Sequence, residues 1–137
     1  MPRIMAIDYG SKRCGIAVTD PLQIIANGLT TVSTHELFSF LENYFGKEEV
    51  ETIVVGEPKR LNGTDTHATP LVNAFVQQLS KKFPGKTIAR VDERFTSKMA
   101  FQAMIDSGLK KKDRANKALV DEVSATIILQ SYMETRR

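Results

Sequence analysis

Three carboxylates far apart in the 137-residue chain have the residue types and positions to do chemistry. The first, Asp8, follows the apolar run Ile4–Ile7 and precedes Tyr9-Gly10. It therefore falls at the carboxyl end of a predicted strand, which is where open α/β sheets bind their ligands. Asp and Gly are also common in ordinary turns, so this short pattern alone indicates a site only weakly.

Asp92 and Glu93 close a later predicted strand, and only one of them can face a packed helix, because side chains alternate along a strand. Glu93 shares its face with Ala89 and Val91, whereas Asp92 shares its face with Arg90. The alternation favours Glu93 as the inward carboxylate and leaves Asp92 as a support or turn residue. In the competing interpretation, both acids simply favour the start of the next helix through its dipole.

Asp121 lies in the first turns of the last predicted helix, beside its apolar stripe. One turn further on, Ser124 and Ala125 are its neighbours on the helix surface, and their small size would let the helix approach the sheet closely. An acid beside an apolar stripe is often only a boundary residue, which is what we expect of Glu122.

The chemistry open to Asp8, Glu93 and Asp121 depends on a cation, because burial and like charge both oppose the ionisation of clustered carboxylates. Oxygen ligands with no His or Cys nearby select Mg²⁺ or Mn²⁺ over zinc. Two such ions roughly 4 Å apart would activate water and stabilise the leaving oxygen of an in-line displacement at phosphorus. The expected reaction is hydrolysis of a phosphodiester.

The elements that must position these acids follow from the apolar pattern. Predicted strands cover residues 3–8, 14–19, 24–32, 51–55 and 86–93. Predicted helices cover 35–45 with Thr34 as cap, 70–83 with Thr69-Pro70 as cap and first position, about 97–107 after Thr96 or Ser97, and about 117–133. Gly56–Thr69 is predicted to be an exposed loop. The order predicts an α/β fold with a five-stranded mixed sheet, antiparallel over its first three strands, parallel between the first, fourth and fifth, and flanked by helices.

Composition is typical of a single soluble domain over residues 1–137, with 42% hydrophobic and 26% charged residues. No apolar run approaches the roughly 20 residues that span a bilayer, and the first residues do not resemble a signal peptide, so we expect a cytoplasmic protein without membrane contact. Cys14 is the only cysteine, which excludes an internal disulfide and a cysteine-rich zinc site. We expect it to fill a buried strand.

The formal net charge of +3 is mild, but residues 110–117 (KKKDRANK) hold five basic residues against one acid. This run is either a contact for nucleic acid or a solvated loop ahead of the last helix. Aromatic residues make up 7% with no tryptophan, so a base-stacking platform is not indicated. His35 and His67 are expected to be solvated, with a general-base role for His67 left open.

Four motifs in order carry a resemblance to a known family: IDYGSKRCGIAVTDP, VVGEP followed by NGT, VDERFTS, and KALVDEVSATIILQSY. From about Ile4 to Tyr132 the chain resembles the YqgF/RuvX family. That resemblance implies a ribonuclease H-like fold related to Holliday junction resolvases. It also implies a nuclease that matures the 5′ end of pre-16S rRNA or, alternatively, resolves branched DNA. Asp8, Glu93 and Asp121 match the acidic cluster of the family.

The same resemblance implies a set of substrate-side residues, each of which is equally well explained as a solvated side chain: Lys12, Arg13, Arg94, Thr96 and Lys117. The chain departs from the family's usual pattern at Glu57, Asn62 and Ser124. None of these departures touches the acidic trio, so they bear on substrate contacts of the loop rather than on catalysis.

The leading hypothesis is therefore a nuclease that uses Mg²⁺ or Mn²⁺, most simply two ions, on structured RNA or branched DNA. A second is a catalytically weak nucleic-acid-binding factor for ribosome assembly, in keeping with the basic run. A third is an ATPase or sugar kinase of the actin-like type, which opens with a similar strand and turn but needs two large domains. A monomer is slightly favoured over a weak homodimer.

Overall fold

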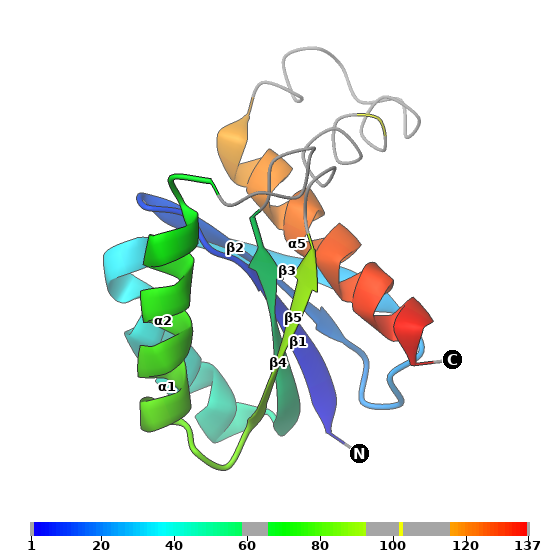
Figure 1. Cartoon of the computed structure of the whole chain (residues 1–137). Coiled ribbons are helices and arrows are strands. Elements are labelled where there is room, and N and C mark those ends of the chain that lie inside the picture. The colour runs from blue at the N-terminus through cyan, green and yellow to red at the C-terminus, as the bar shows by residue number, and fades with distance from the viewer. Residues whose placement is uncertain (1, 59–65, 93–101, 103–115, 137) are drawn as a thin grey trace.

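The centre of the protein is a five-stranded mixed sheet with the order β3-β2-β1-β4-β5 (Figure 1). The computed structural model describes residues 2–58, 66–92, 102 and 116–136. The strands are β1 (Arg3–Asp8), β2 (Arg13–Thr19), β3 (Ala26–Ser33), β4 (Val50–Glu57) and β5 (Thr87–Asp92). β1, β2 and β3 pair antiparallel, whereas β1, β4 and β5 pair parallel. The predicted topology is confirmed.

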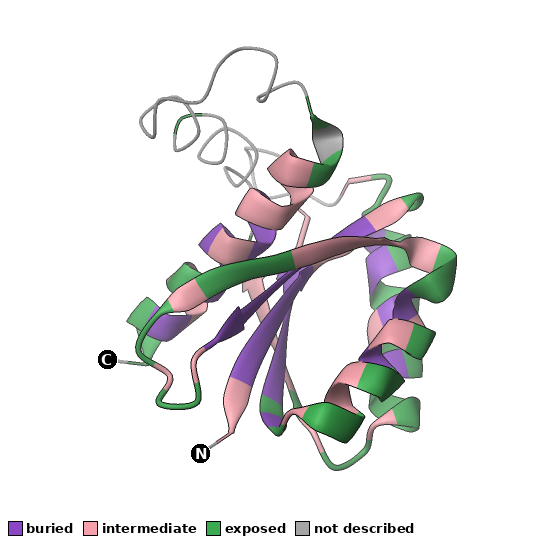
Figure 2. Ribbon diagram, turned by 180° about the vertical axis from the view of Figure 1, so that it is seen from behind, coloured by how far each residue is buried: buried purple, intermediate pink, exposed green. Residues whose placement is uncertain are grey.

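Helices cover both faces of this sheet (Figures 1 and 2). On one face lie a 3₁₀ turn, η1 (Thr34–Glu36), and the helices α1 (Leu37–Lys47) and α2 (Thr69–Lys82), while α5 (Lys117–Thr135) crosses the other. Alternation along β1 divides its side chains between two cores, because Met5 and Ile7 pack toward α1 and α2 and Ile4 and Ala6 pack toward α5. Residue parity in a strand thus tells which helix a side chain meets.

Two predicted helix caps are wrong, because tertiary contacts claim the hydroxyl groups. The Thr34 hydroxyl donates to the Gly10 carbonyl at 2.6 Å, and α1 begins only at Leu37, after η1. Thr69 is the first residue of α2 rather than its cap, and its hydroxyl donates to the Pro58 carbonyl at 3.2 Å. Both hydroxyl groups therefore bind carbonyl groups of other segments and do not cap a helix.

The third strand begins at Ala26 and not at residue 24, because Asp20 holds the preceding residues in a turn. Its carboxylate accepts hydrogen bonds from the backbone N–H groups of Leu22, Ile24 and Ile25. The predicted helix over 97–107, apart from residue 102, and residues 59–65 of the predicted loop over 56–69 lie outside the described residues. Within the described part of the chain, no helix has the length and apolar character to span a membrane.

Candidate active site

The candidate site lies where β1 ends, β2 begins and the first turns of α5 cross the sheet. Asp8 is the last residue of β1 and has the same parity as Ile4 and Ala6, which belong to the core beneath α5. Arg13, the first residue of β2, has the parity of Ala17, which lies in that core too. Position 8, position 13 and helix α5 therefore share one side of the sheet.

Gly15 brings Asp8 and Asp121 together. It is the register partner of Asp8 across the β1–β2 pair. A Cβ atom at Gly15 would collide with the backbone carbonyl oxygen of Asp121, so α5 rests directly on the strand at this point. Ser124 and Ala125, whose small size predicted a close approach of the helix to the sheet, are buried, and the backbone of α5 meets β2 at Gly15. Asp8 and Asp121 are thus both neighbours of one glycine.

Asp121 is paired with Arg13 across 108 positions of sequence. The Arg13 Nε atom donates to Oδ2 of Asp121 at 2.6 Å, and the two side chains retain 35% and 25% of their exposure. A guanidinium so close to a carboxylate favours the ionised state of the carboxylate and offsets repulsion from neighbouring acids. The site therefore carries a positive group where clustered acids require one.

The start of α5 is fixed by two side chains. Asn116 caps the helix by accepting hydrogen bonds from the N–H groups of Ala118 and Leu119 at 3.1 and 3.3 Å. The Thr31 hydroxyl, on β3, donates a hydrogen bond to the Ala118 carbonyl at 2.6 Å. Asp121, one turn further along, is thereby held at a defined height above the sheet.

The turn between β1 and β2 is held in place by Thr34, the first residue of η1. The Thr34 hydroxyl donates to the Gly10 carbonyl, and the Thr34 backbone N–H donates to the Lys12 carbonyl at 3.0 Å. The Cys14 sulfur lies 3.5 Å from the Thr34 hydroxyl, and Cys14 is fully buried as predicted. Residues 10–12 are therefore tied to the start of η1.

Cys14 lies within the influence of both acidic residues. Burial is the main cause that raises the pKa of the Cys14 thiol, while hydrogen bonds with Thr34 and Gly10 lower it. The negative charges of Asp8 and Asp121 each raise the pKa of this thiol as well. Both carboxylates thus act on the same buried sulfur, in agreement with their common contact at Gly15.

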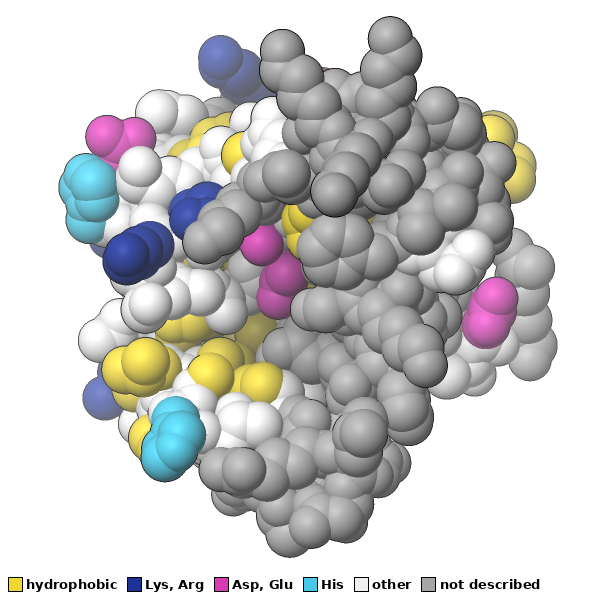
Figure 3. All heavy atoms as spheres, turned by 90° about the horizontal axis from the view of Figure 1, so that it is seen from above, with side chains coloured by type: hydrophobic (Ala, Val, Ile, Leu, Met, Phe, Trp, Pro, Cys, Tyr) yellow, Lys and Arg dark blue, Asp and Glu magenta, His cyan; other side chains and the backbone are white. Residues whose placement is uncertain are grey.

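A hollow of about 250 Å³ opens beside these groups, and its lining residues are Gly10, Ser11, Lys12, Arg13 and Asp121. Lys12 is exposed on its rim. Seen from the carboxyl end of the parallel strands, acidic side chains gather near the middle of this face with basic ones beside them (Figure 3). Such a mixed hollow can receive a cation through its carboxylate and an anionic group through its lysine and arginine.

The last strand follows the predicted alternation. Ala89 and Val91 pack against the core under α5, whereas Ile88 packs against the core under α1 and α2. Asp92 has the parity of Ile88 and is the register partner of Glu57. Asp92 and Glu57 are therefore on the other side of the sheet from Asp8.

Several of the remaining predicted site residues are not among those that the structure describes. Glu93, Arg94, Thr96 and residues 110–115 lie outside the described residues, and Lys117 is the first residue of α5. Among the residues that are described, no group of three or more His, Cys, Asp or Glu could hold a metal ion. His35 and His67 are exposed, as predicted.

Two positioning residues were not predicted, although the sequence contained a signal for each. A glycine inside a strand, such as Gly15, often marks the close approach of another backbone. An asparagine directly before a helix, such as Asn116, is a preferred cap. The Arg13–Asp121 pair had no comparable local signal.

Comparison with known proteins gives consistent matches. The family model described as "RuvX: Holliday junction resolvase" matches residues 2–135. A protein of Flavobacterium johnsoniae named "Putative pre-16S rRNA nuclease" is 59% identical over 137 residues, covering 100% of this chain and 99% of that protein. One of the same name from Flavobacterium psychrophilum is 61% identical over 133 residues, covering 97% of each.

Among solved structures, "T. thermophilus RuvC in complex with Holliday junction substrate" is similar with a TM-score of 0.55 and 14% identity, covering 98% of each chain. At this identity the likeness concerns the fold alone. The fold is ribonuclease H-like, as the resemblance of the motifs implied.

Proposed function

This chain belongs to the RuvX family, and from that membership we propose that it is a metal-dependent nuclease that matures the 5′ end of pre-16S rRNA in the cytoplasm. Residues 1–137 act as one nuclease domain in this proposal. The observation that carries it is the meeting of Asp8 and Asp121 at Gly15, with Arg13 as counter-charge. The names of the curated relatives support ribosomal RNA as the substrate.

The described part of the proposed acidic cluster fits a hard divalent cation. Asp8 and Asp121 supply carboxylate oxygens, which suit Mg²⁺ or Mn²⁺. The guanidinium of Arg13 already occupies a cation's position on Oδ2 of Asp121. We assign Glu93 as the third ligand, on the strength of the family motif and of its parity with Ala89 and Val91.

The reaction is the attack of a water oxygen on phosphorus, with cleavage of one P–O bond to give a phosphate monoester and a free hydroxyl group. Two bound Mg²⁺ or Mn²⁺ ions would lower the pKa of the attacking water and neutralise the leaving oxygen. Asp8 is positioned by β1, of which it is the last residue. Asp121 is positioned by α5, whose start is capped by Asn116. The chain's contribution is to hold these ligands at fixed positions.

The substrate's phosphates meet the basic side of the same hollow. Lys12 and Arg13 line it together with Asp121, so a phosphate beside that carboxylate lies within their reach. Lys117 opens α5, and Arg94 and Thr96 complete the proposed set by match to the family motifs. Contacts of this kind orient the backbone of the nucleic acid without reading its sequence.

The test is cleavage of a pre-16S rRNA fragment by purified protein in Mg²⁺, in Mn²⁺ and in chelator. We expect metal-dependent products from the wild type and a loss of at least about 100-fold in Asp8→Asn and Asp121→Asn. Glu134→Gln, at the exposed far end of α5, is the matched control and should cleave normally. Cleavage by Asp121→Asn at the wild-type rate would contradict the assignment.

A second candidate is the resolution of four-way DNA junctions, which the description of the matching family favours. The same preparations are assayed on a four-way junction beside the RNA fragment. Preferential cleavage of the junction would replace RNA by branched DNA as the substrate, with the same carboxylates in use. Salt-sensitive binding without products in any metal would instead favour the role of an assembly factor.

A further inference from the structure

The residue that follows Asp8 carries an aromatic ring at the same edge of the sheet. Tyr9 is half-buried, and its ring stacks on Phe75 of α2, with the ring centroids 4.3 Å apart and 15° between the ring planes. Phe75 is buried and packs in turn against Phe38, at 5.7 Å between ring centroids. One face of the Tyr9 ring is therefore supported by a buried partner, which limits its motion.

Tyr9 lies next to the hollow of the candidate active site. Side chains alternate along β1, so Asp8 faces α5 while Tyr9 faces α2, in agreement with its contact with Phe75. Gly10, the next residue, lines the hollow beside Asp121, and neighbouring Cα atoms are only about 3.8 Å apart. A molecule that occupies the hollow and continues over the sheet edge toward α2 therefore passes Tyr9.

The start of α2 extends the apolar surface on this side. Leu71, in the first turn, is 53% exposed and lies four positions before Phe75, so the two are neighbours along the helix surface. Figure 3 shows hydrophobic side chains gathered on the same face of the molecule as the acidic and basic ones. The hollow and this apolar surface are thus open to the same bound molecule.

Charges on the two sides of the edge decide how a nucleotide would lie there. Lys12 and Arg13 attract a phosphate into the hollow. Glu57 and Tyr9 each follow the last pair of β4 and β1 by two positions, so the Glu57 carboxylate comes level with Tyr9 and repels a phosphate on that side. The phosphate is therefore favoured in the hollow, and the uncharged base is favoured on the side of Tyr9.

We propose that Tyr9, backed by Phe75, is the subsite for one unpaired base of the nucleic acid, next to the phosphate that binds in the hollow. This inference rests on the proposed function and deepens it, because only a base outside a duplex can present its face to an aromatic ring. It narrows the substrate to nucleic acid that is single-stranded beside the bound phosphate. The aromatic content does not indicate a platform of several rings, but one ring is enough for one base.

The first test is photocrosslinking of the full-length chain to short single-stranded RNA that carries one 5-iodouridine, in chelator, where no cleavage is expected. On irradiation an iodinated base crosslinks to an aromatic ring on which it is stacked, and mass spectrometry identifies the residue. We expect a crosslink at position 9 in the wild type and in Tyr9→Phe, which keeps the ring, and its loss in Tyr9→Leu.

Tyr44→Leu is the matched control for this loss. Tyr44 is also half-buried and is stacked on Phe40, at 6.0 Å between ring centroids. It lies in the last turn of α1, at the amino ends of the parallel strands and so at the other end of the sheet (Figure 1). This variant should crosslink at Tyr9 like the wild type, and thermal unfolding of each variant shows that it folds.

The second test needs no protein variant, because the base is removed instead of the ring. An abasic nucleotide at the position that crosslinks should weaken binding by the wild type by about 5- to 150-fold, the effect of one stacked base. Tyr9→Leu should weaken binding of the intact RNA to a similar degree. It should bind the abasic RNA as the wild type does, because no base is left to stack.

Crosslinks found only at other residues would overturn the proposal, and so would abasic RNA that binds as tightly as intact RNA. Neither result concerns cleavage, so the nuclease assignment would stand. A protein that crosslinks at Tyr9 but cleaves no nucleic acid in any metal would instead contradict the nuclease and leave the base subsite in place.

Discussion

The Arg13 Nε atom lies 2.6 Å from Oδ2 of Asp121 and joins the first residue of β2 to the second turn of α5. Both residues line the same hollow. In the proposed mechanism the guanidinium neutralises the carboxylate before a cation binds and is free to meet a phosphate afterwards. The pair therefore links the electrostatics of the site to the binding of both metal and substrate.

Replacing Arg13 by Gln separates these two roles. The metal-free site loses its counter-charge, so we expect a loss of stability of up to about 1 kcal/mol, the usual range for a partly exposed pair. The cation then no longer competes with the guanidinium, and metal affinity should rise by up to about fivefold, while RNA cleavage falls. The measurement is the rise in Tm over a Mn²⁺ titration, set beside the cleavage rate.

Arg136→Gln is the control for that experiment, because it removes an arginine whose ion pair with Glu51, at 4.0 Å, is remote from the site. It should leave the metal titration unchanged. A Tm response to Mn²⁺ in Arg13→Gln that is equal to or smaller than in the wild type would show that the guanidinium does not compete with the cation.

Adding a methyl group at Gly15 should displace α5. A Cβ atom there meets the Asp121 carbonyl, so we expect Gly15→Ala to lower the free energy of unfolding by about 1–3 kcal/mol and to reduce cleavage by moving Asp121 away from Asp8. Gly46→Ala is the matched control, because nothing lies within 4 Å of its Cβ position and alanine favours the helix by about 0.5–1 kcal/mol. Urea denaturation checks both values. Equal stability of the two variants would contradict the close packing inferred at Gly15.

Strand faces were predictable because they depend on local alternation, and strand pairing was predictable from the order of the elements and the handedness of their crossovers. Short apolar runs within residues 3–8 and 86–93 identified strands, and parity correctly separated Ala89 and Val91 from Ile88. The predicted burial of Cys14 followed from the same pattern. The faces of the strands that carry the candidate site were thus accessible from sequence alone.

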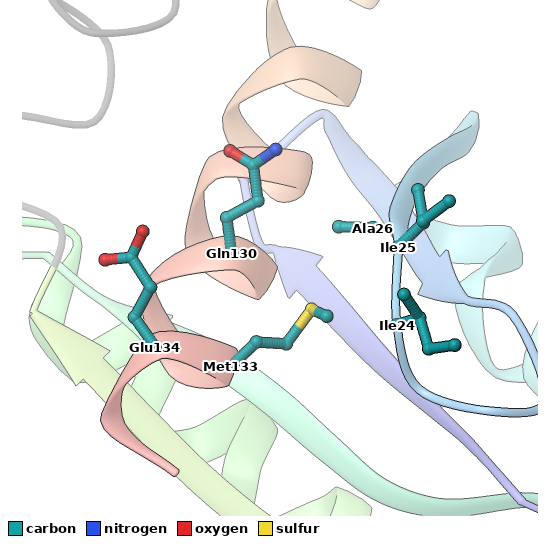
Figure 4. A pocket seen from close by; sticks show the side chains of 6 residues that line it. All are labelled: Ile24, Ile25, Ala26, Gln130, Met133 and Glu134. Atoms are coloured by element: carbon teal, nitrogen blue, oxygen red, sulfur yellow. The ribbon is translucent and has the colours of Figure 1, made fainter. Parts of the chain in front are cut away.

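Contacts between distant segments were not predictable in this way. Thr34 and Thr69 have the residue type of a helix cap, but Gly10 and Pro58 bring competing acceptors from other parts of the chain. The partner of Arg13 depends on where the first turns of α5 meet the sheet, which no local pattern encodes. For the same reason, the hollow between residues 24–26 and the end of α5 is visible only after folding (Figure 4).

Lys12 should contribute to binding through its charge alone. It is exposed on the rim of the hollow, so Lys12→Ala is expected to weaken binding of RNA and of DNA to a similar degree and to reduce the slope of log K against log salt by about 1. Binding titrations at several salt concentrations give this slope. Lys47→Ala, at the exposed end of α1, serves as the control and should keep the wild-type slope. A sequence-selective loss in Lys12→Ala would argue for base contact instead.

The turn before β3 should weaken in acid through Asp20. The hydrogen bond from the Ile25 N–H is the largest cause that lowers the pKa of Asp20, desolvation opposes it, and the N–H groups of Ile24 and Leu22 lower the pKa further. A carboxylate whose folded pKa is depressed stabilises the fold fully above its unfolded pKa, and this contribution is lost as pH falls through the folded pKa.

Asp20→Ala should therefore be less stable than the wild type at pH 7, and the difference should shrink in acid. Asp20→Asn keeps one acceptor oxygen but cannot ionise, so its stability at pH 7 should lie between the two. Denaturation midpoints from pH 7 down to pH 2 measure the effect, and a difference between Asp20→Ala and wild type that stays constant over this range would show that the ionised carboxylate does not hold the turn.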